Sequence, residues 1–137
     1  MNDKFVIILK IKIKNKDLVM CIFCKIVAGE IPSNKVLEND EFIAFHDINP
    51  VAPVHILIIP KEHIENFQST SPELMAKMTS FIQDVAKELC LDKNGYRLVT
   101  NNGKDGGQEV PHLHFHLLGG AKLKWTHLTE NDTHKSL

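Results

Sequence analysis

The feature that most constrains the fold of this chain is an alternation of histidine with apolar residues near its C-terminal end. In PHLHFHLLGG, residues 111–120, histidines occupy positions 112, 114 and 116, and apolar residues occupy positions 113, 115 and 117. Side chains of a β-strand point alternately to the two faces of a sheet. A strand over residues 112–118 would therefore place the apolar residues against a core. The three imidazoles would lie about 6–7 Å apart along the opposite face.

Three imidazoles on one face of a strand indicate a functional site. Burying them costs desolvation free energy, and they repel one another when protonated. Two chemical interpretations remain open. Either the three rings bind one metal ion together, or they divide roles around an anionic substrate, one as nucleophile and the others as hydrogen-bond donors.

The rest of the chain predicts an antiparallel sheet covered by helices. The clearest helix begins at Ser71, which can cap it, with Pro72 at the first helical position and apolar side chains recurring at helical spacing to Leu89. This helix is expected to end before Asn94-Gly95, and a shorter one is predicted over residues 23–29. Predicted strands are a hairpin over 35–48 with Asn39-Asp40 at its turn, then 55–60, 96–102 and 112–118. Short turns and one long crossing helix favour an α+β fold.

Composition and charge exclude several classes of protein. The chain has 137 residues, which suits one domain, and its net charge of −1 argues against a nucleic-acid binder. No apolar run approaches the roughly 20 residues that cross a bilayer, and the N-terminal apolar run is too short for a signal peptide. Three cysteines without an export signal predict a cytoplasmic protein. One of them, Cys90, is expected to be a core or boundary thiol.

The two ends of the chain differ from its centre. Residues 1–19 are predicted to form an N-terminal extension before a domain over residues 20–125, and residues 126–137 are predicted to form a polar tail. Isoleucine alternates with lysine in the extension, which suits an edge strand. The simpler interpretation is a loosely attached segment without a chemical role, and Met20 could be the functional start.

Two segments near the histidines carry groups that suit a phosphorylated, sugar-containing ligand. NNGKDGGQEV, residues 101–110, offers the amides of Asn101 and Gln108 and several glycine N–H groups to phosphate oxygens and sugar hydroxyls. AFHDINPVAPVHILIIPKEH, residues 44–63, adds His55, His63 and Asp47, and the carboxylate of Asp47 suits a ribose diol.

Together these segments resemble the histidine triad (HIT) family, and within it the Hint branch. HLHFHLL matches the triad motif, while AFHDINPVAPVHILIIPKEHI and GGQEVPHLHFHLLGG extend the resemblance over roughly residues 20–125. The resemblance implies a five-stranded antiparallel sheet with two helices, paired into a homodimer with a ten-stranded sheet. It also implies an enzyme that hydrolyses or transfers nucleotides at the α-phosphate.

The resemblance assigns roles to individual residues. His114 would be the nucleophile, whose neutral ring attacks the α-phosphorus while a backbone carbonyl holds its other nitrogen. The resulting nucleotidyl-histidine would then be cleaved by water. His116 would contact phosphate, and His55 would support the nucleophile. Other polar contacts would come from Asn101 and Gln108 on the phosphate side and from Asp47 at the ribose. An apolar base pocket would be formed by Ile22, Phe23, Ile26, Ile31, Phe45 and Ile48.

Two positions depart from the family pattern. Glu109 stands where animal members of the Hint branch carry a serine that helps to protonate the leaving amine. Pro111 occupies a position that is often aromatic. The first departure puts the acid step of the reaction in question, and neither affects the three histidines.

The motif CIFC places Cys21 and Cys24 at the spacing of a thiolate zinc hook. The pair alone is half a site, and two buried thiols beside the base pocket are the alternative. It resembles the pair of a family subset whose structural zinc also binds the histidine of PKEH and the first triad histidine, here His63 and His112. Such a closed zinc site would leave His114 free to react and argues against a catalytic metal on all three triad histidines.

The function predicted from the sequence is hydrolysis of purine nucleoside phosphoramidates at the α-phosphate. Three alternatives stay open: a dinucleoside polyphosphate hydrolase, a zinc-bearing nucleotide-binding regulatory protein with little catalysis, and a metallohydrolase using the whole triad. The sequence LLGG followed by AKLKW favours the Hint branch, in which the region of Trp125 resembles a tail that approaches the site of the neighbouring subunit.

Overall fold

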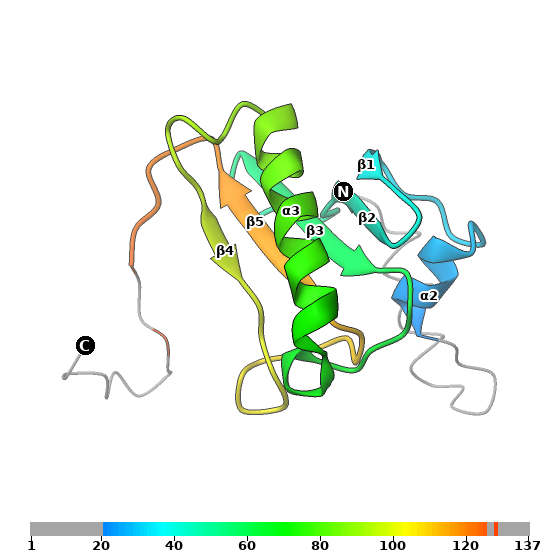
Figure 1. Ribbon diagram of the computed structural model, residues 1–137. Coiled ribbons are helices and arrows are strands. Elements are labelled where there is room, and N and C mark those ends of the chain that lie inside the picture. Colours follow the sequence, from blue (N-terminus) through cyan, green and yellow to red (C-terminus); the bar gives the residue numbers. More distant parts are fainter. Residues whose placement is uncertain (1–20, 126–127, 129–137) are drawn as a thin grey trace.

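The computed structural model describes residues 21–125 and Leu128, so the predictions for residues 1–19 and for most of the 126–137 tail lie outside the described residues. Figure 1 shows how the elements are arranged. In chain order they are α2 (Ile22–Val27), β1 (Lys35–Glu38), β2 (Phe42–His46), β3 (Val54–Pro60), the short 3-10 helix η2 (Phe67–Ser69), α3 (Pro72–Glu88), β4 (Arg97–Val99) and β5 (Phe115–Gly119).

The five strands form one antiparallel sheet in the order β1-β2-β3-β5-β4, which confirms the predicted α+β fold with two α-helices. The central strand, β3, pairs with β2 on one side and with β5 on the other. In the register of the second pair, Leu57 lies opposite His116. The C-terminal strand thus brings the histidine segment beside the centre of the sheet.

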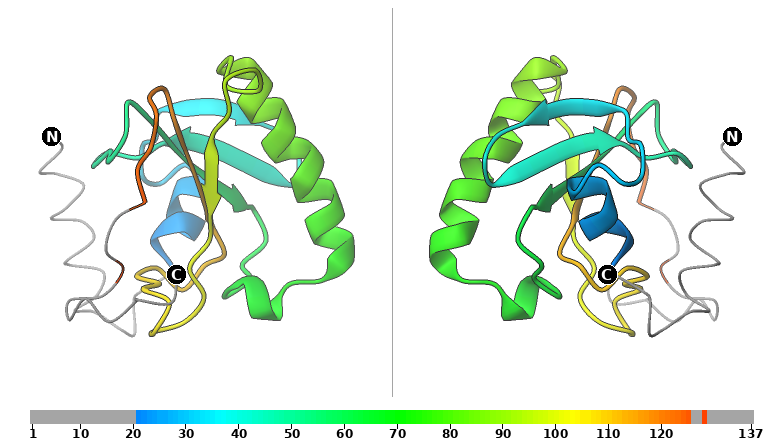
Figure 2. Two further views of the ribbon diagram at one scale, coloured as in Figure 1. Left: turned by 90° about the vertical axis from the view of Figure 1, so that its left-hand side faces the viewer. Right: turned by 90° about the vertical axis from the view of Figure 1, so that its right-hand side faces the viewer.

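The two α-helices lie on opposite faces of the sheet, as the side views in Figure 2 show. The alternation of β3 supplies both faces: Ile56 and Ile58 belong to the core under α3, whereas Leu57 and Ile59 belong to the core under α2. The first core is completed by Leu113, Phe115 and Leu117 and by the apolar stripe of α3. The predicted apolar face of the histidine segment therefore packs as expected.

The N-terminus of α3 follows its sequence signals. The Oγ atom of Ser71 accepts a hydrogen bond from the N–H of Leu74 at 3.1 Å, and Pro72 occupies the first turn. This cap satisfies one of the N–H groups that a helix leaves without an intrahelical partner.

The C-terminus of α3 differs from the prediction. The helix ends at Glu88, several residues before Asn94-Gly95. Cys90 adopts a left-handed conformation with φ of 58° and is exposed, so the prediction of a core or boundary thiol is wrong. The reversal returns Leu91 to the core, where it is 6% exposed.

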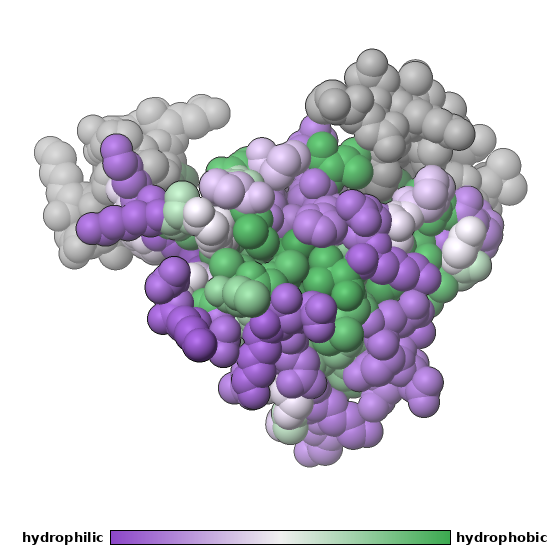
Figure 3. Space-filling view, turned by 90° about the horizontal axis from the view of Figure 1, so that it is seen from above, coloured by the Kyte–Doolittle hydropathy of each residue, from purple (hydrophilic) through white to green (hydrophobic). Residues whose placement is uncertain are grey.

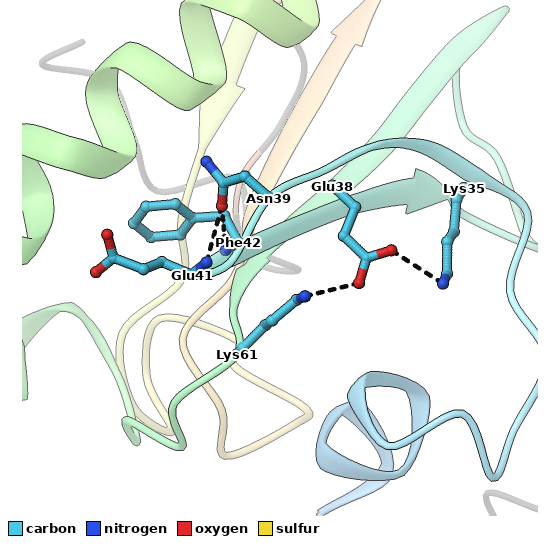
Figure 4. Close-up of polar contacts among 6 residues, drawn as sticks. All are labelled: Lys35, Glu38, Asn39, Glu41, Phe42 and Lys61. Atoms are coloured by element: carbon cyan, nitrogen blue, oxygen red, sulfur yellow. Dashed lines mark hydrogen bonds and ion pairs between the residues drawn. The ribbon is translucent and has the colours of Figure 1, made fainter.

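The hairpin between β1 and β2 turns at Asn39-Asp40, as predicted. The Oδ1 atom of Asn39 accepts hydrogen bonds from the N–H groups two and three residues later, at 2.9 and 2.8 Å (Figure 4). Beside the turn, the carboxylate of Glu38 bridges the ammonium groups of Lys35 at 3.0 Å and Lys61 at 2.7 Å. Exposed ion pairs of this kind contribute little stability. We therefore attribute the register of the hairpin to the hydrogen bonds of the Asn39 turn.

Three further elements, besides α3 and the hairpin, have bounds that differ between the prediction and the structure. The helix over 23–29 is observed as α2, the strand over 96–102 as β4, and the strand over 112–118 as β5, which begins only at Phe115. In the last case, Phe115 lies opposite Ile58, and the same register places Leu113 opposite Pro60, which has no N–H to donate. Residues 112–114 therefore lie beyond the ladder and need other partners.

Viewed from above, apolar surface is gathered in the middle of the molecule and is surrounded by hydrophilic side chains (Figure 3). Within the described part of the chain, none of the helices has the length and apolar character needed to span a bilayer.

Candidate active site

A pocket of about 480 Å³ opens between α2, β2, the loop over residues 101–110 and the histidine segment. One wall is apolar and the other carries polar and ionisable groups. The apolar wall comprises Ile22, Phe23, Ile26, Phe45, Ile48 and Leu57. The polar wall includes Asp47, Asn101, Glu109, His114 and His116. A pocket of this composition suits a ligand with a flat apolar part and a charged part.

Five of the six residues predicted for the base pocket line its apolar wall. Ile31 is buried in the core under α2 but does not line the pocket. Leu57 does line it and was not predicted. The alternation of HILIIP held the signal for Leu57, because it places this residue on the face opposite Ile56 and Ile58.

His114 lies at the junction of the two walls with one nitrogen already engaged. Its Nδ1 atom lies 2.7 Å from the carbonyl oxygen of His112. A carbonyl can only accept, so Nδ1 carries the proton and Nε2 keeps its lone pair. Burial lowers the pKa of His114, opposed by that hydrogen bond and by the charges of Asp47 and Glu109. The ring is therefore neutral at neutral pH, with a nucleophilic nitrogen available.

The backbone around His114 is held by contacts outside the sheet ladder. The N–H of Leu113 donates to the carbonyl of Ile64 at 2.6 Å, and the hydroxyl of Thr100 donates to the carbonyl of His114 at 2.7 Å. These bonds replace the ladder that Pro60 interrupts. Thr100 was not predicted, since a side chain that bonds to backbone leaves no motif.

The ring of His116 makes a close contact with His55, the predicted supporting histidine. Its Nδ1 atom lies 2.9 Å from Nε2 of His55, and that Nε2 atom lies 3.4 Å from Oδ2 of Asp47. The rings of His114 and His116 have centroids 5.2 Å apart. Burial, with the nearby imidazoles, lowers the pKa of His116 to about 4, and burial lowers the pKa of His55 against the pull of Asp47. The imidazoles of His116 and His55 are therefore both neutral at neutral pH.

The two predicted amides occupy different places. Asn101 lines the pocket. Gln108 does not, because its Oε1 accepts from the N–H of Gly103 at 2.8 Å and its Nε2 donates to the carbonyls of Glu65 and Val110 at 2.8 and 2.9 Å. The Gln108 amide thus ties the glycine-rich loop together instead of facing the pocket.

A second cluster unites the cysteine pair with two histidines. The donor atoms of Cys21, Cys24, His63 and His112 all lie within 4.8 Å of one another. Nδ1 of His112 lies 3.3 Å from Sγ of Cys21 and 3.5 Å from Sγ of Cys24. Nδ1 of His63 lies 3.2 Å from Sγ of Cys24 and 3.2 Å from Nδ1 of His112.

This geometry fits a tetrahedral zinc ion. With Zn–N near 2.1 Å and Zn–S near 2.3 Å, the edges between donors are about 3.4–3.8 Å long, close to the observed distances. Nε2 of His112 donates to the carbonyl of Pro60 at 2.9 Å, which leaves Nδ1 as the ligand atom. Burial and the neighbouring Cys21 raise the pKa of Cys24 to about 11, so a bound cation must displace its proton.

The structure therefore divides the triad instead of gathering it around one metal. His112 belongs to the cysteine cluster, and His116 belongs to a group with His55 and Asp47. His114 belongs to neither group and hydrogen-bonds to the backbone. This arrangement contradicts the alternative of a single metal ion bound by all three triad histidines.

Comparison with known proteins gives a consistent result. The model of the HIT domain family matches residues 28–123. An uncharacterized HIT-like protein of Helicobacter pylori is 56% identical over 103 residues, which are 75% of this chain and 99% of that protein. A solved HIT family hydrolase of Legionella pneumophila is 46% identical with a TM-score of 0.74, covering 77% of this chain and 97% of its own.

A more distant solved structure keeps the same fold. A histidine triad nucleotide-binding protein of Candida albicans is 35% identical with a TM-score of 0.69, and the match covers 85% of this chain and 91% of its own. Because the family model spans most of the residues that build the sheet and both histidine clusters, this chain belongs to the HIT domain family.

Proposed function

We propose that this protein is a nucleotide hydrolase of the Hint branch that cleaves purine nucleoside phosphoramidates at the α-phosphate. The observation that carries the proposal is the state of His114, a neutral imidazole that lines the pocket, with its Nδ1–H bound to a carbonyl and its other nitrogen unprotonated. The names of two similar proteins, a HIT family hydrolase and a histidine triad nucleotide-binding protein, support the broader assignment of a nucleotide-binding hydrolase.

The shape of the pocket suggests how a nucleotide would bind. The base would lie against the apolar wall, where Phe23 and Phe45 meet edge to face with ring centroids 5.9 Å apart. Asp47 would accept hydrogen bonds from the ribose diol, while its Oδ1 is oriented by the N–H of Asn49 at 2.7 Å. The α-phosphate would then lie between His114 and His116, which line the same pocket.

The proposed reaction proceeds through two displacements. Nε2 of His114 attacks the α-phosphorus, and the bond to the leaving amine breaks as the amine takes up a proton. Water then attacks the same phosphorus, and the bond to His114 breaks to release the nucleoside monophosphate. Dividing one difficult displacement in this way is covalent catalysis. Glu109 lines the pocket as a charged carboxylate, so we propose that the amine takes its proton from solvent and that Glu109 accepts the proton of the attacking water.

We also propose that the cysteine–histidine cluster holds a structural zinc ion. Cys21, Cys24, His63 and His112 would supply all four ligands, as the fit of their donor distances supports. Zinc bound there would link α2 to the histidine segment and would have no open position for substrate. Catalysis would remain with the imidazoles of the pocket.

The proposed enzyme is a homodimer whose sheets join into ten strands. β4 ends the sheet on one side, and its Leu98 is 42% exposed. Trp125 is 69% exposed and stacks under Arg97, with 5.3 Å from the guanidinium carbon to the ring centroid. Apolar side chains beside an edge strand suit an interface with a second copy. Sedimentation should report a dimer that Leu98→Lys weakens; a monomeric parent chain would refute this assembly.

The test of the function compares two substrates and looks for the intermediate. Adenosine phosphoramidate should be hydrolysed faster than a diadenosine polyphosphate, and rapid quenching should trap a nucleotide on His114, located by mass spectrometry of peptides. The opposite substrate preference would favour a dinucleoside polyphosphate hydrolase. Nucleotide binding without turnover of any substrate would favour a regulatory protein, and turnover without an adduct would reject the mechanism.

A further inference from the structure

His55 is buried, and each of its ring nitrogens has a neighbour whose role is chemically determined. The backbone N–H of Val51 points at Nδ1 of His55 at 3.1 Å. On the other side of the ring, Nε2 lies 2.9 Å from Nδ1 of His116 and 3.4 Å from Oδ2 of Asp47. The ring is 6% exposed, so water has little access to it.

The backbone contact decides where the proton of His55 lies. A peptide N–H can only donate, so Nδ1 of His55 must accept and carry no proton. The neutral ring then has its proton on Nε2. This N–H faces Nδ1 of His116, which must accept in turn, because two N–H groups at 2.9 Å would repel each other. The proton of a neutral His116 is left on Nε2.

We propose that His55 is a positioning residue, which transmits the hydrogen-bond polarity of the Val51 N–H to His116 and so holds the His116 proton on Nε2. These hydrogen bonds run from the Val51 N–H through His55 to His116. They form a relay that fixes the direction of each bond, and no proton moves along it. Only the backbone N–H of Val51 takes part in the relay, since the residue is 76% exposed.

The same proton assignment argues against a metal ion at this place. Ligand atoms of Asp47, His55 and His116 lie within 4.8 Å of one another, as a metal site would require. A metal on Nε2 of His55 would need the proton on Nδ1, where it would meet the N–H of Val51. The two clusters found among the described residues therefore have similar donor spacing but carry their protons differently. Nδ1 of His112 has a free lone pair for a shared ion, whereas neither imidazole of the Asp47 cluster does.

The relay gives the pocket two histidines of opposite character, and this consequence rests on the proposed function. His114 carries its proton on Nδ1 and presents a lone pair, whereas His116 presents an N–H. A lone pair suits attack on phosphorus, and an N–H suits the negative charge that develops on the phosphate oxygens. With the other tautomer, His116 would turn a lone pair toward those oxygens.

Nitrogen NMR of the full chain with 15N-labelled histidine, zinc-loaded and without nucleotide, tests the relay directly. We expect protonated Nε2 and unprotonated Nδ1 in both His55 and His116, with a scalar coupling across the hydrogen bond that joins them. In His55→Leu, the signals of His116 should move toward the average of its two tautomers. A proton found on Nδ1 of His116 in the parent protein would overturn the proposal.

Two variants of Val51 test the origin of the relay. Val51→Pro removes the backbone N–H, and the signals of His55 should then show a mixture of tautomers. Val51→Ala keeps the N–H and should leave those signals unchanged, because the side chain is exposed. An unaltered His55 in a folded Val51→Pro variant would contradict the proposal. If proline does not fit this bend, the parent protein and His55→Leu still decide the question.

Kinetics separates this proposal from the proposed function. We expect His55→Leu to lower kcat for the phosphoramidate by between about 10- and 100-fold, as for a displaced transition-state donor, with a smaller change in KM. The predicted tautomers in a protein that hydrolyses no nucleotide would leave the relay standing and reject the function. An active enzyme with the His116 proton on Nδ1 would reject the relay and leave the proposed function standing.

Discussion

The cysteine–histidine cluster and the nucleotide pocket contain neighbouring histidines of one short segment, yet their rings are used in opposite senses. His112 donates through Nε2 to the carbonyl of Pro60 and turns the lone pair of Nδ1 to the two sulfur atoms. His114 donates through Nδ1 to the carbonyl of His112 and keeps the lone pair of Nε2 for the pocket. In each case a backbone carbonyl decides which nitrogen is free.

The triad motif sets where the histidines lie in the chain, whereas backbone carbonyls set which ring nitrogen of each histidine keeps a lone pair. The two regions also share a wall, because the ring of Phe23 meets His112 and His114 edge to face with centroids 5.9 and 5.1 Å away. Phe23 lies in α2 between the two cysteines in sequence. The proposed metal site and the proposed nucleotide site are thus neighbours in space but distinct in mechanism.

The largest expected effect comes from removing the nucleophile. His114→Ala should reduce turnover of the phosphoramidate by at least about 1,000-fold, because no other group supplies the attacking lone pair. Nucleotide affinity should change little, and metal analysis should still find one zinc per chain.

His112→Ala is the matched variant two residues away. It should lose the zinc but keep most of its activity below its unfolding temperature, because the carbonyl that orients His114 is retained. If the two variants showed the same losses of metal and activity, the division between the two regions would be wrong.

The second effect concerns stability and belongs to the cysteine cluster alone. Cys21→Ser and Cys24→Ser should each abolish zinc binding and lower the free energy of unfolding by about 4 kcal/mol at a zinc concentration 1,000 times the dissociation constant. Thermal unfolding with and without a chelator measures this loss. Cys90→Ser is the control, since this exposed thiol lies outside the cluster. Equal destabilisation by all three variants would reject the zinc site.

Much of the fold could be predicted because its signals are local. The cap at Ser71 and the turn at Asn39 depend on residues within a few positions of each other. The start of β5 could not be predicted, because it depends on the register with a distant strand, which places Leu113 opposite the missing N–H of Pro60. Likewise, only the packed structure shows that Leu91 returns to the core and leaves Cys90 exposed.

The site was predictable to the extent that side chains define it. The four residues of the cysteine cluster are brought together as the resemblance implied. Gln108 was expected at the phosphate, but its amide bonds to carbonyls and an N–H of other loop segments, which no motif records. The N–H of Val51 was equally invisible, because every residue except proline has one.

A third, smaller effect is loss of stability in acid, and it tests the neutral state of the pocket histidines. The pKa of His116 is held near 4 by burial and by His114 and His55, against an ordinary value of 6.5. The unfolded chain therefore binds a proton that the folded chain refuses between about pH 6.5 and pH 4. Stability should be full above this window and fall as the pH decreases through it.

Urea unfolding at a series of pH values measures this dependence. One such proton corresponds to at most about 1.4 kcal/mol per pH unit, and the half-buried ring will show less. His116→Gln should flatten the dependence within the window, whereas the acid release of zinc is common to both proteins. An identical pH dependence in the variant would show that His116 titrates normally.

The smallest effect concerns the hydroxyl of Thr100, which fixes the backbone of His114 beyond the end of the sheet ladder. Thr100→Val keeps the shape of the side chain and removes one hydrogen bond, so it should cost about 1 kcal/mol of unfolding free energy. Thr79→Val is the control, because it removes a similar bond to the carbonyl of Met75 on the exposed side of α3.

The two threonine variants should differ most in catalysis. A backbone freed at His114 displaces a nitrogen that must meet phosphorus along one line, so Thr100→Val should lower kcat more than its loss of stability alone accounts for. Thr79→Val should leave kcat unchanged, since it lies in α3 away from the pocket. If Thr100→Val kept full kcat, the strand-like start of the histidine segment would be held well enough by the N–H of Leu113, and the sheet side of the pocket would be more rigid than its hydrogen bonds suggest.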